Sequence, residues 1–342
     1  MAEEKKIISA EEKAKAIRKM KIEKIITVTI LALLILGIVS ALIFKSIVGT
    51  WWVEVQTDST TSGAYIYFGG GAMNNIADVT MTGETTNNFF GISVSTAGDL
   101  NGDGYSDVIV GAWAYSSQRG RAYIYYGGAV MNAVADVVMT GASPSNNFGV
   151  SVSTAGDVNA DGYSDVIIGA DVYSAYTGLA YIFYGGASMN NVSDVFMIGE
   201  ASNNNFGYSV SSAGDLNGDG YSDVIAGAYG YSTNKGKSYI YFGGSSMDNA
   251  ADITMEGGAT DDLFGFSVSS AGDVNGDGFS DAIVGSHGYN SVTGRAYIFY
   301  GGMYMNNIAD VTMTGETTIN SFGISVSSAG DVNRDGYSDV IV

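Results

Sequence analysis

A unit of 58 residues recurs along this chain of 342 residues. The motif "DLNGDGYSD" begins at Asp99 and returns with small changes at Asp157, Asp215, Asp273 and Asp331, always at the same step. Phe-Gly pairs, aromatic runs such as "AYIYFGG", and single methionines keep that step too. Five copies in register predict a chain built from repeated supersecondary units, each burying its apolar face against its neighbours.

Four short segments within one copy have β character. "FGVSVSTAG" alternates polar and apolar residues, "SDVIIGA" contains a short apolar run typical of a buried strand, "LAYIFYGG" is aromatic and β-branched, and "DVFMIG" is a fourth short segment. Turns rich in glycine and asparagine separate them, and no segment has helical spacing. Four short strands per copy are typical of a β-propeller blade. The alternative is an elongated β-solenoid, whose turns are usually shorter than this repeat.

The length of the repeat region predicts five blades, because residues 53–342 amount to five copies. The chain enters the repeat near the end of a second strand and leaves it in a second strand. The end segments would then pair into a composite fifth blade that closes the ring without an open sheet edge. The alternative is a shortened chain from a propeller of seven blades. The segments involved are "WWVEV" (51–55), 64–68 and 78–82 at the start, and 322–342 at the end.

The N-terminal residues differ from the repeats in charge and hydropathy. Residues 25–44 carry no charge, and as a helix they would span about 30 Å, the thickness of a bilayer's hydrocarbon core. Six basic residues crowd the preceding flank, so the positive-inside rule puts the N-terminus in the cytoplasm and the repeats outside the cell. The alternatives are a cleaved signal peptide or a pilin-like leader. The predicted organisation is a basic cytoplasmic segment (1–24), a transmembrane helix (25–44), a linker (45–60) and an all-β propeller (61–342).

Composition excludes several kinds of function. The chain has no cysteine, hence no disulfide and no thiolate metal site, and His287 is its single histidine. Residues 49–342 have a net charge of −24, which argues against nucleic acid as a partner. Glu84, Glu200 and Glu316 lie in variable segments, but no pair of carboxylates is marked as acid and base. We therefore expect no enzyme, with a glycosidase as the alternative.

The repeated motif predicts a site for a hard cation. Aspartate and asparagine at alternate positions of a tight loop supply the oxygen ligands that Ca²⁺ prefers, and Gly104 is expected where the first loop turns sharply. An EF-hand would need glutamate at position 12, where this chain has Val110. The alternative is an Asx-rich turn without an ion. Up to five Ca²⁺ ions are predicted, although Arg334 within the fifth loop argues against the last. The predicted ligands, with position 7 acting through its backbone carbonyl, are Asp99, Asn101, Asp103, Tyr105 and Asp107; Asp157, Asn159, Asp161, Tyr163 and Asp165; Asp215, Asn217, Asp219, Tyr221 and Asp223; Asp273, Asn275, Asp277, Phe279 and Asp281; and Asp331, Asn333, Asp335, Tyr337 and Asp339.

Phe-Gly, the acidic loop, and then Gly-Ala after an apolar strand together resemble the FG-GAP repeat. This is the unit of the integrin α-chain propeller and of many microbial surface proteins. The resemblance implies calcium loops on the underside of the propeller and a ligand face formed at the other end by variable loops. Integrin α chains are anchored at the C-terminus and contain cysteines, so the resemblance covers the propeller alone. The variable loops are 113–118, 171–176, 229–234 and 287–292 between second and third strands, and 84–88, 142–147, 200–205 and 258–262 between blades.

The expected function is that of a membrane-anchored, calcium-binding propeller outside the cell, in adhesion or protein recognition. The alternatives are a carbohydrate-binding propeller and a self-assembling surface or filament subunit. The partners expected are the membrane, an extracellular protein or glycan, and a further copy of the chain if it forms oligomers. Tyr115, Tyr173, Tyr231 and Tyr289 recur in every variable loop, and are expected to pack against the blades or to bind ligand.

Overall fold

The computed structural model describes residues 44–45, 52–53, 62–70 and 74–342. By its contacts the chain divides into residues 1–59 and 60–342. In the first unit, β1 (Phe44–Lys45) pairs with β2 (Trp52–Val53). The predicted membrane helix lies outside the described residues except for its last residue, Phe44. Within those residues, no helix is long and apolar enough to cross a membrane.

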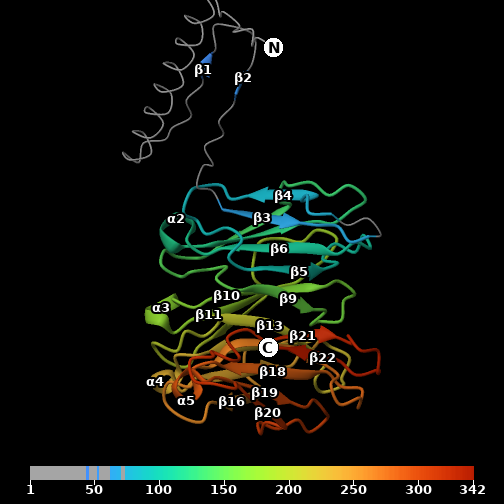
Figure 1. Ribbon diagram of the computed structural model, residues 1–342. Coiled ribbons are helices and arrows are strands. Elements are labelled where there is room, and N and C mark those ends of the chain that lie inside the picture. Colours follow the sequence, from blue (N-terminus) through green and yellow to red (C-terminus); the bar gives the residue numbers. More distant parts are fainter. Residues whose placement is uncertain (1–43, 46–51, 54–61, 71–73) are drawn as a thin grey trace, which may run out of the picture. The chain divides into compact units, whose positions relative to one another are not determined.

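The second unit is all-β, as predicted, and its complete sheets are antiparallel and four-stranded, consistent with propeller blades. In each sheet the strands lie in chain order, and sheets from successive copies follow one another through the unit (Figure 1). Blade 1 is β5 (Val94–Gly98), β6 (Asp107–Ala112), β7 (Arg121–Tyr125) and β8 (Val137–Thr140); blade 2 is β9 (Val152–Gly156), β10 (Asp165–Ala170), β11 (Leu179–Phe183) and β12 (Val195–Ile198); blade 3 is β13 (Ser209–Gly214), β14 (Asp223–Ala228), β15 (Lys237–Tyr241) and β16 (Ile253–Glu256); and blade 4 is β17 (Phe264–Gly272), β18 (Asp281–Ser286), β19 (Arg295–Phe299) and β20 (Val311–Thr314).

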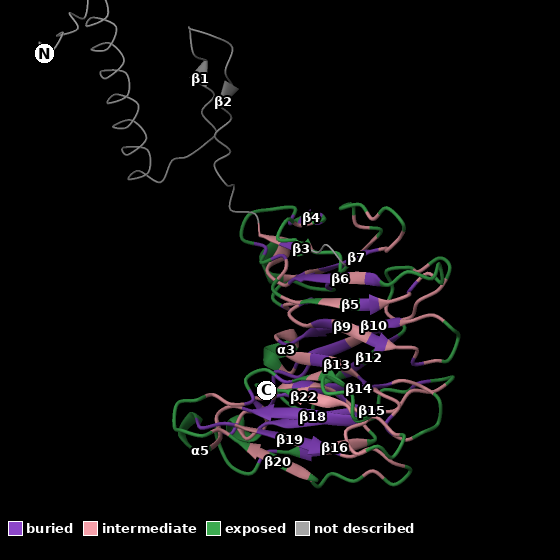
Figure 2. Cartoon of the chain, turned by 45° about the vertical axis from the view of Figure 1, so that its right-hand side comes forward, coloured by how far each residue is buried: buried purple, intermediate pink, exposed green. Residues whose placement is uncertain are grey.

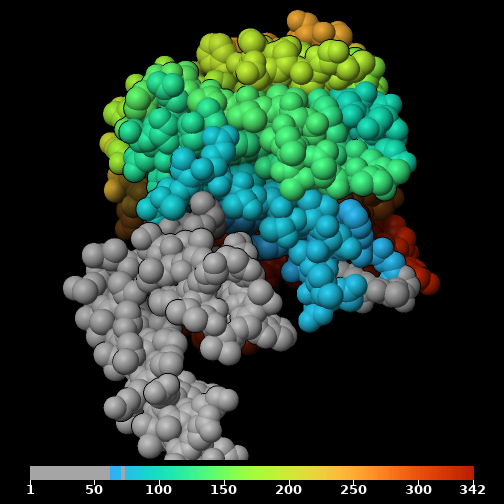
Figure 3. Space-filling model, turned by 90° about the horizontal axis from the view of Figure 1, so that it is seen from above, coloured from blue at the N-terminus to red at the C-terminus, as the bar shows by residue number. Residues whose placement is uncertain are grey.

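Two half-sheets flank these blades. The N-terminal half-sheet consists of β3 (Gly63–Ile66) and β4 (Val79–Thr82), which correspond to the third and fourth strands of a copy. The C-terminal half-sheet consists of β21 (Ser327–Gly330) and β22 (Asp339–Ile341), the first and second strands of a copy. In the space-filling view, the surface passes from the blue N-terminal half-sheet through green to yellow residues, in the order of the sequence (Figure 3).

The core lies between consecutive blades. The second strands β10, β14 and β18 are buried at every residue, because each has a neighbouring strand on both edges and a further sheet on each face (Figure 2). One cluster joins Ile167 and Ile182 of blade 2 to Val224 and Tyr239 of blade 3. Burial on both faces explains why these strands are continuously apolar rather than alternating.

Close backbone contacts at each junction explain the repeated glycines. A side chain at Gly111 would collide with the carbonyl of Gly149 in the next blade, and one at Gly149 would collide with the carbonyl of Arg121. Ser93 then accepts the amide hydrogen of Val152 at 3.0 Å, and serine accepts across the next three junctions in the same way. The Phe-Gly and Gly-Ala elements of the repeat therefore encode the approach of one blade to the next.

Each blade also has a short turn that the sequence analysis did not predict. Each of these turns has three consecutive residues with positive φ, such as Ser116 (48°), Ser117 (61°) and Gln118 (60°). Gly120 donates to the carbonyl of Tyr115 at 3.1 Å and closes the first turn. A single left-handed turn is too short to produce helical spacing in the sequence. The four turns are α2 (Tyr115–Gln118), α3 (Tyr173–Tyr176), α4 (Tyr231–Asn234) and α5 (Tyr289–Val292).

The predicted composite fifth blade is not formed. Within the described part of the chain the two half-sheets are separate sheets, and Trp52–Val53 pairs with β1 instead of extending the repeat. Val94 in β5 is 56% exposed, whereas its equivalents Val152 and Val210 are about 4–5% exposed, because no first strand of a preceding blade covers it. The same contacts are used at every junction, so each turns the next blade alike, and four such junctions do not bring β21 against β5.

Candidate functional site

The acidic loops connect the first and second strands of each blade and are tightly folded. In the first loop, the carboxylate of Asp99 accepts the amide hydrogens of Gly102, Asp103 and Gly104 at 2.8, 3.1 and 2.8 Å. Gly104 has φ of +87°, as its expected role in the turn requires. Tyr105 donates its amide hydrogen to Asp103 at 2.9 Å. Each aspartate thus caps the backbone of its own loop, which is the Asx geometry weighed as the alternative to an ion.

The chemistry of the donor atoms suits a hard cation. Asp99, Asn101 and Asp103 offer oxygen ligands, and Asn101 donates from Nδ2 to Oδ2 of Asp103 at 3.0 Å, so these last two side chains lie together. Among the described residues, however, no group of three or more His, Cys, Asp or Glu side chains is arranged to hold a metal ion. The carboxylates face backbone amides here, so the calcium ligands remain a prediction.

The last aspartate of each loop has a different role from the first three positions. Asp165 is fully buried, and its two carboxylate oxygens accept amide hydrogens from Val158 and Gly185, both at 2.8 Å. It thereby ties the first loop of the blade to the segment after the third strand. Burial raises the pKa of Asp165 and of Asp223 to about 7, and also raises the pKa of Asp107 and Asp281.

The acidic loops also form part of the junction between blades. The carbonyl of Asp99 accepts the amide hydrogen of Ser164 at 3.0 Å, and the carbonyl of Leu100 accepts that of Gly186 at 2.7 Å. Both donors belong to blade 2. The same pair of bonds recurs at the next two junctions, so the conformation of one loop is transmitted directly to the following blade.

The variable loops lie at the opposite end of the sheets, because antiparallel strands place the 2–3 and 4–1 connections together. The turns α2 to α5 mark this end along the left side of Figure 1. Ala114 donates its amide hydrogen to Asn88, and Asn146 donates to Gln118, at 3.2 and 3.0 Å, so the two kinds of loop interlock. We call this end of the blades the loop face.

The recurring tyrosines of the loop face pack against cationic side chains. The Arg121 guanidinium carbon lies 3.8 Å from the centre of the Tyr115 ring, and the Arg295 guanidinium carbon lies 3.5 Å from that of Tyr289. Tyr173, whose blade has no cation at that place, packs against the apolar core instead. These contacts favour the packing role over ligand binding for this set.

Ion pairs across the blade junctions were missed by the sequence analysis. Glu84 accepts two hydrogen bonds from Arg121, at 2.7 and 2.8 Å, and Glu200 accepts one from Lys237 at 2.6 Å. The signal was present in the sequence, because glutamate is followed 37 residues later by a cation in these two copies. In the intervening copy, Ala142 and Leu179 occupy the two positions.

The position after the second strand differs in chemistry from blade to blade. Asp171 is buried and accepts hydrogen bonds from the side-chain amides of Asn147 and Asn205, both at 3.1 Å. Burial raises its pKa, and the two amides partly offset that effect. His287 occupies the same position in blade 4 and packs against Phe266 with ring centres 4.2 Å apart. Burial lowers the pKa of His287, and its Nδ1 atom is buried without a hydrogen-bond partner among the described residues.

Comparison with known proteins agrees with the resemblance to the FG-GAP repeat that the motifs indicated. Residues 90–125, 148–183, 206–241 and 264–299 match the FG-GAP repeat, which covers the first three strands of blades 1 to 4. Integrin alpha-5 of Xenopus laevis is 33% identical over 188 residues, 51% of this chain and 17% of its own length. Integrin alpha pat-2 of Caenorhabditis elegans is 30% identical over 268 residues, which cover 71% of this chain and 21% of that protein. The phosphatidylinositol-glycan-specific phospholipase D of Bos taurus is 30% identical over 182 residues, which cover 47% of this chain and 22% of that protein. The chain thus spans about a fifth of the length of these relatives, carries four FG-GAP repeats, and is similar to integrin α subunits along its repeat region.

Proposed function

We propose that this chain is a membrane-anchored, calcium-stabilised recognition module outside the cell, which binds a protein ligand through the loop face. The observation that carries the proposal is the contrast between the two ends of the blades. The acidic loops are nearly identical in every copy, whereas the loops of the loop face differ from copy to copy. Positions that blade packing does not dictate are free to serve binding, and similarity to integrin α subunits supports a role in adhesion or recognition.

Calcium has a structural role in this proposal. Asp99, Asn101 and Asp103 and their equivalents would hold the ion, which would draw the first loop of each blade into one shape. Because the loop donates and accepts across the junction, that shape also fixes the next blade. Extracellular calcium modules bind with Kd of about 10⁻⁴–10⁻³ M, so millimolar calcium adds about 1.4 kcal/mol for a site at the tighter end. The ion would thus stabilise the fold rather than contact the ligand.

Cell-surface exposure is tested by protease treatment of intact cells that produce the full chain. The basic flank at residues 13–24 and the uncharged stretch at 25–44 support an N-terminus in the cytoplasm. External protease should then remove the repeats and leave the N-terminal segment with the cells. Protection of the repeats in intact cells, or release of a chain that begins near residue 42, would contradict the anchored topology.

Recognition is tested with the full chain reconstituted into lipid vesicles. The vesicles are attached to beads, and the beads are mixed with intact cells. Binding should need calcium, should be lost when the target cells are treated with protease, and should fall when residues 229–234 and 287–292 are exchanged for 171–176. A matched control exchanges two acidic loops, which should leave binding unchanged. Binding that survives protease but is lost after glycosidase treatment would favour the carbohydrate-binding alternative. Ordered filaments of the pure chain would favour the self-assembling subunit.

A further inference from the structure

The first blade shows how a cation is held on the loop face. Arg121 donates from Nε to the hydroxyl of Thr140 at 3.1 Å and lies over the ring of Tyr115. Its Nη1 atom then points to the carboxylate of Glu84. The glutamate comes from the loop that leaves the preceding sheet. Hydroxyl, ring and carboxylate together satisfy the guanidinium, and the carboxylate supplies the opposite charge.

Arg295 in blade 4 is held in the same way but lacks the carboxylate. Its Nε atom donates to the hydroxyl of Thr314 at 3.1 Å, and its guanidinium lies over Tyr289. The residue that corresponds to Glu84 is Gly258. Among the described residues, no carboxylate lies within ion-pair distance of Arg295.

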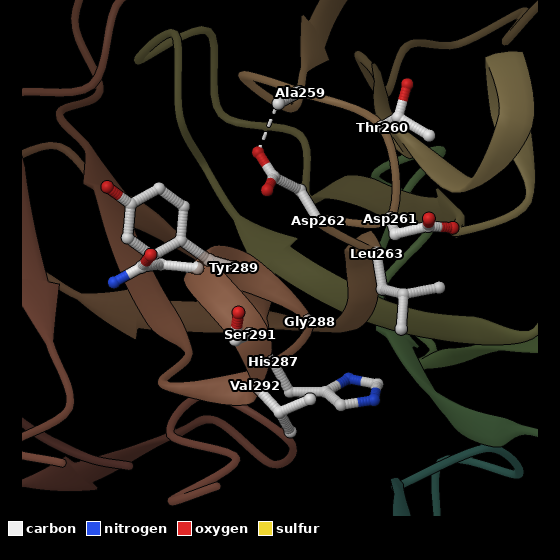
Figure 4. A pocket seen from close by; sticks show the side chains of 11 residues that line it. Ala259, Thr260, Asp261, Asp262, Leu263, His287, Gly288, Tyr289, Ser291 and Val292 are labelled. Atoms are coloured by element: carbon white, nitrogen blue, oxygen red, sulfur yellow. Dashed lines mark hydrogen bonds between the residues drawn. The ribbon is translucent and has the colours of Figure 1, made fainter. Parts of the chain in front are cut away.

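The surroundings leave the missing position open. Gly258 is exposed, and an added Cβ atom there would meet only Oδ2 of Asp262, at 3.3 Å. Asp262 itself is turned toward the backbone, where it accepts the amide hydrogen of Gly258 at 3.0 Å and that of Ala259 at 2.7 Å; Figure 4 shows the second of these bonds. Next to Tyr289 lies a pocket of about 620 Å³, whose walls come from residues 259–263 and 287–292.

We propose that Arg295 is a carboxylate-binding point of the loop face, at which an acidic side chain of a protein ligand takes the place that Glu84 fills in blade 1. The guanidinium is already oriented by Thr314 and Tyr289, so little conformational freedom is lost when the carboxylate arrives. The adjoining pocket would receive the neighbouring residues of the ligand. The biological use of this site rests on the proposed function. Its geometry does not, because every residue that forms it belongs to this chain.

The test follows the arginine Nε–Hε signals of the full chain by NMR in detergent, at constant ionic strength. The chain has five arginines, namely Arg18, Arg119, Arg121, Arg295 and Arg334, and single Arg→Lys variants assign their signals. The probe is N-acetylglutamate methylamide, and its glutamine analogue is the neutral control. The Arg295 signal should shift saturably with the acid, with an affinity about tenfold or more above that of Arg121, and should ignore the amide.

Two variants supply matched controls. Gly258→Glu should restore the internal ion pair, so that the Arg295 signal moves toward that of Arg121 and no longer responds to the probe. Glu84→Gly should free Arg121 and make its signal respond. Thermal unfolding of both variants checks that they remain folded. Equal responses at Arg121 and Arg295 in the unaltered chain, or a response to the glutamine analogue, would overturn the proposal. Failure of the bead assay alone would instead count against the proposed function.

Discussion

Lys237 shows how much one residue depends on its neighbours in the repeat. Its side chain is 9% exposed, and Nζ lies 2.6 Å from Glu200 and 3.8 Å from Glu256, over the rings of Tyr231 and Tyr239. A cation this buried is tolerated because carboxylates and ring faces surround it. In blade 2, leucine and alanine occupy the positions of Lys237 and Glu200, so an apolar pair can fill the same junction.

Removal of one partner of this pair should therefore cost more than removal of both. Glu200→Ala is expected to lower the free energy of unfolding by about 1 kcal/mol, because Lys237 keeps only the longer contact with Glu256. The double variant with Lys237→Leu should recover most of that loss. Urea unfolding of the two single variants and the double variant measures the coupling energy between Glu200 and Lys237. If the two single losses simply add up in the double variant, the expected coupling is absent.

His287 should make stability depend on pH. Its folded pKa is lowered by burial, so below about pH 6.5 the unfolded chain binds a proton more readily than the folded chain. Stability should then fall as pH decreases from about 6.5. Asp261 and Asp262 line the same pocket, but burial sets the direction of the shift.

The control for this effect is His287→Tyr, which introduces the residue that blade 3 has at that position, Tyr229. Thermal unfolding of both proteins between pH 5 and 8 gives the difference curve, which cancels the contributions of the carboxylates. A difference that does not change with pH would show that His287 titrates as it would in water.

The acidic loop combines two tasks in one element. Its first positions face the exposed end of the blade, where they cap the backbone and where, in the proposed function, they would hold an ion. Its last aspartate is buried and joins two loops: in blade 3, Asp223 accepts from Leu216 and Gly243 at 2.7 and 2.9 Å. Calcium should affect the first task and leave the second largely unchanged.

Two substitutions in blade 3 separate these tasks. Asp223→Ala leaves two amide hydrogens without acceptors and should cost about 2–4 kcal/mol with calcium or with EGTA. In calcium, Asp215→Ala should clearly lower the free energy of unfolding. In EGTA, the variant should differ from the unaltered chain only by the loss of its loop hydrogen bonds. Thermal unfolding under both conditions checks this, and an unaltered chain that unfolds at the same temperature in EGTA would contradict calcium stabilisation.

At the scale of the whole molecule, stability is expected to decrease from the middle blades to the ends. Blades 2 and 3 have a complete blade on each side, whereas each half-sheet has two strands and one neighbour. Repeat proteins of this kind draw their stability from interfaces with neighbours. Amide hydrogen exchange should be slowest in β10 and β14 and fastest in β3–β4 and β21–β22. Equal protection throughout would indicate that the half-sheets are covered in solution.

Much of the fold could be predicted from the sequence because the same strand and loop patterns recur in every copy of the repeat. Four strands per copy were predicted and are present, since alternation and β-branched runs report local preference and burial directly. The left-handed turns, such as Ser116–Gln118, could not be predicted, because single serine and glutamine residues carry no preference for positive φ. The pairs Glu84–Arg121 and Glu200–Lys237 needed a comparison of copies at a spacing of 37 residues, which only the fold makes meaningful.

The sequence by itself determined the repeat length, the strands of each blade, and the oxygen-rich loops, because all of these depend on contacts within one copy. Tertiary structure decided which side chains each copy offers to its neighbour. It buried Asp165 and Asp223, paired Glu84 and Glu200 with cations, and left Arg295 without a carboxylate partner among the described residues. It also decided that the half-sheets stay apart. The angle between blades is the sum of many small contacts at the junctions, and no pattern along a single copy encodes that sum.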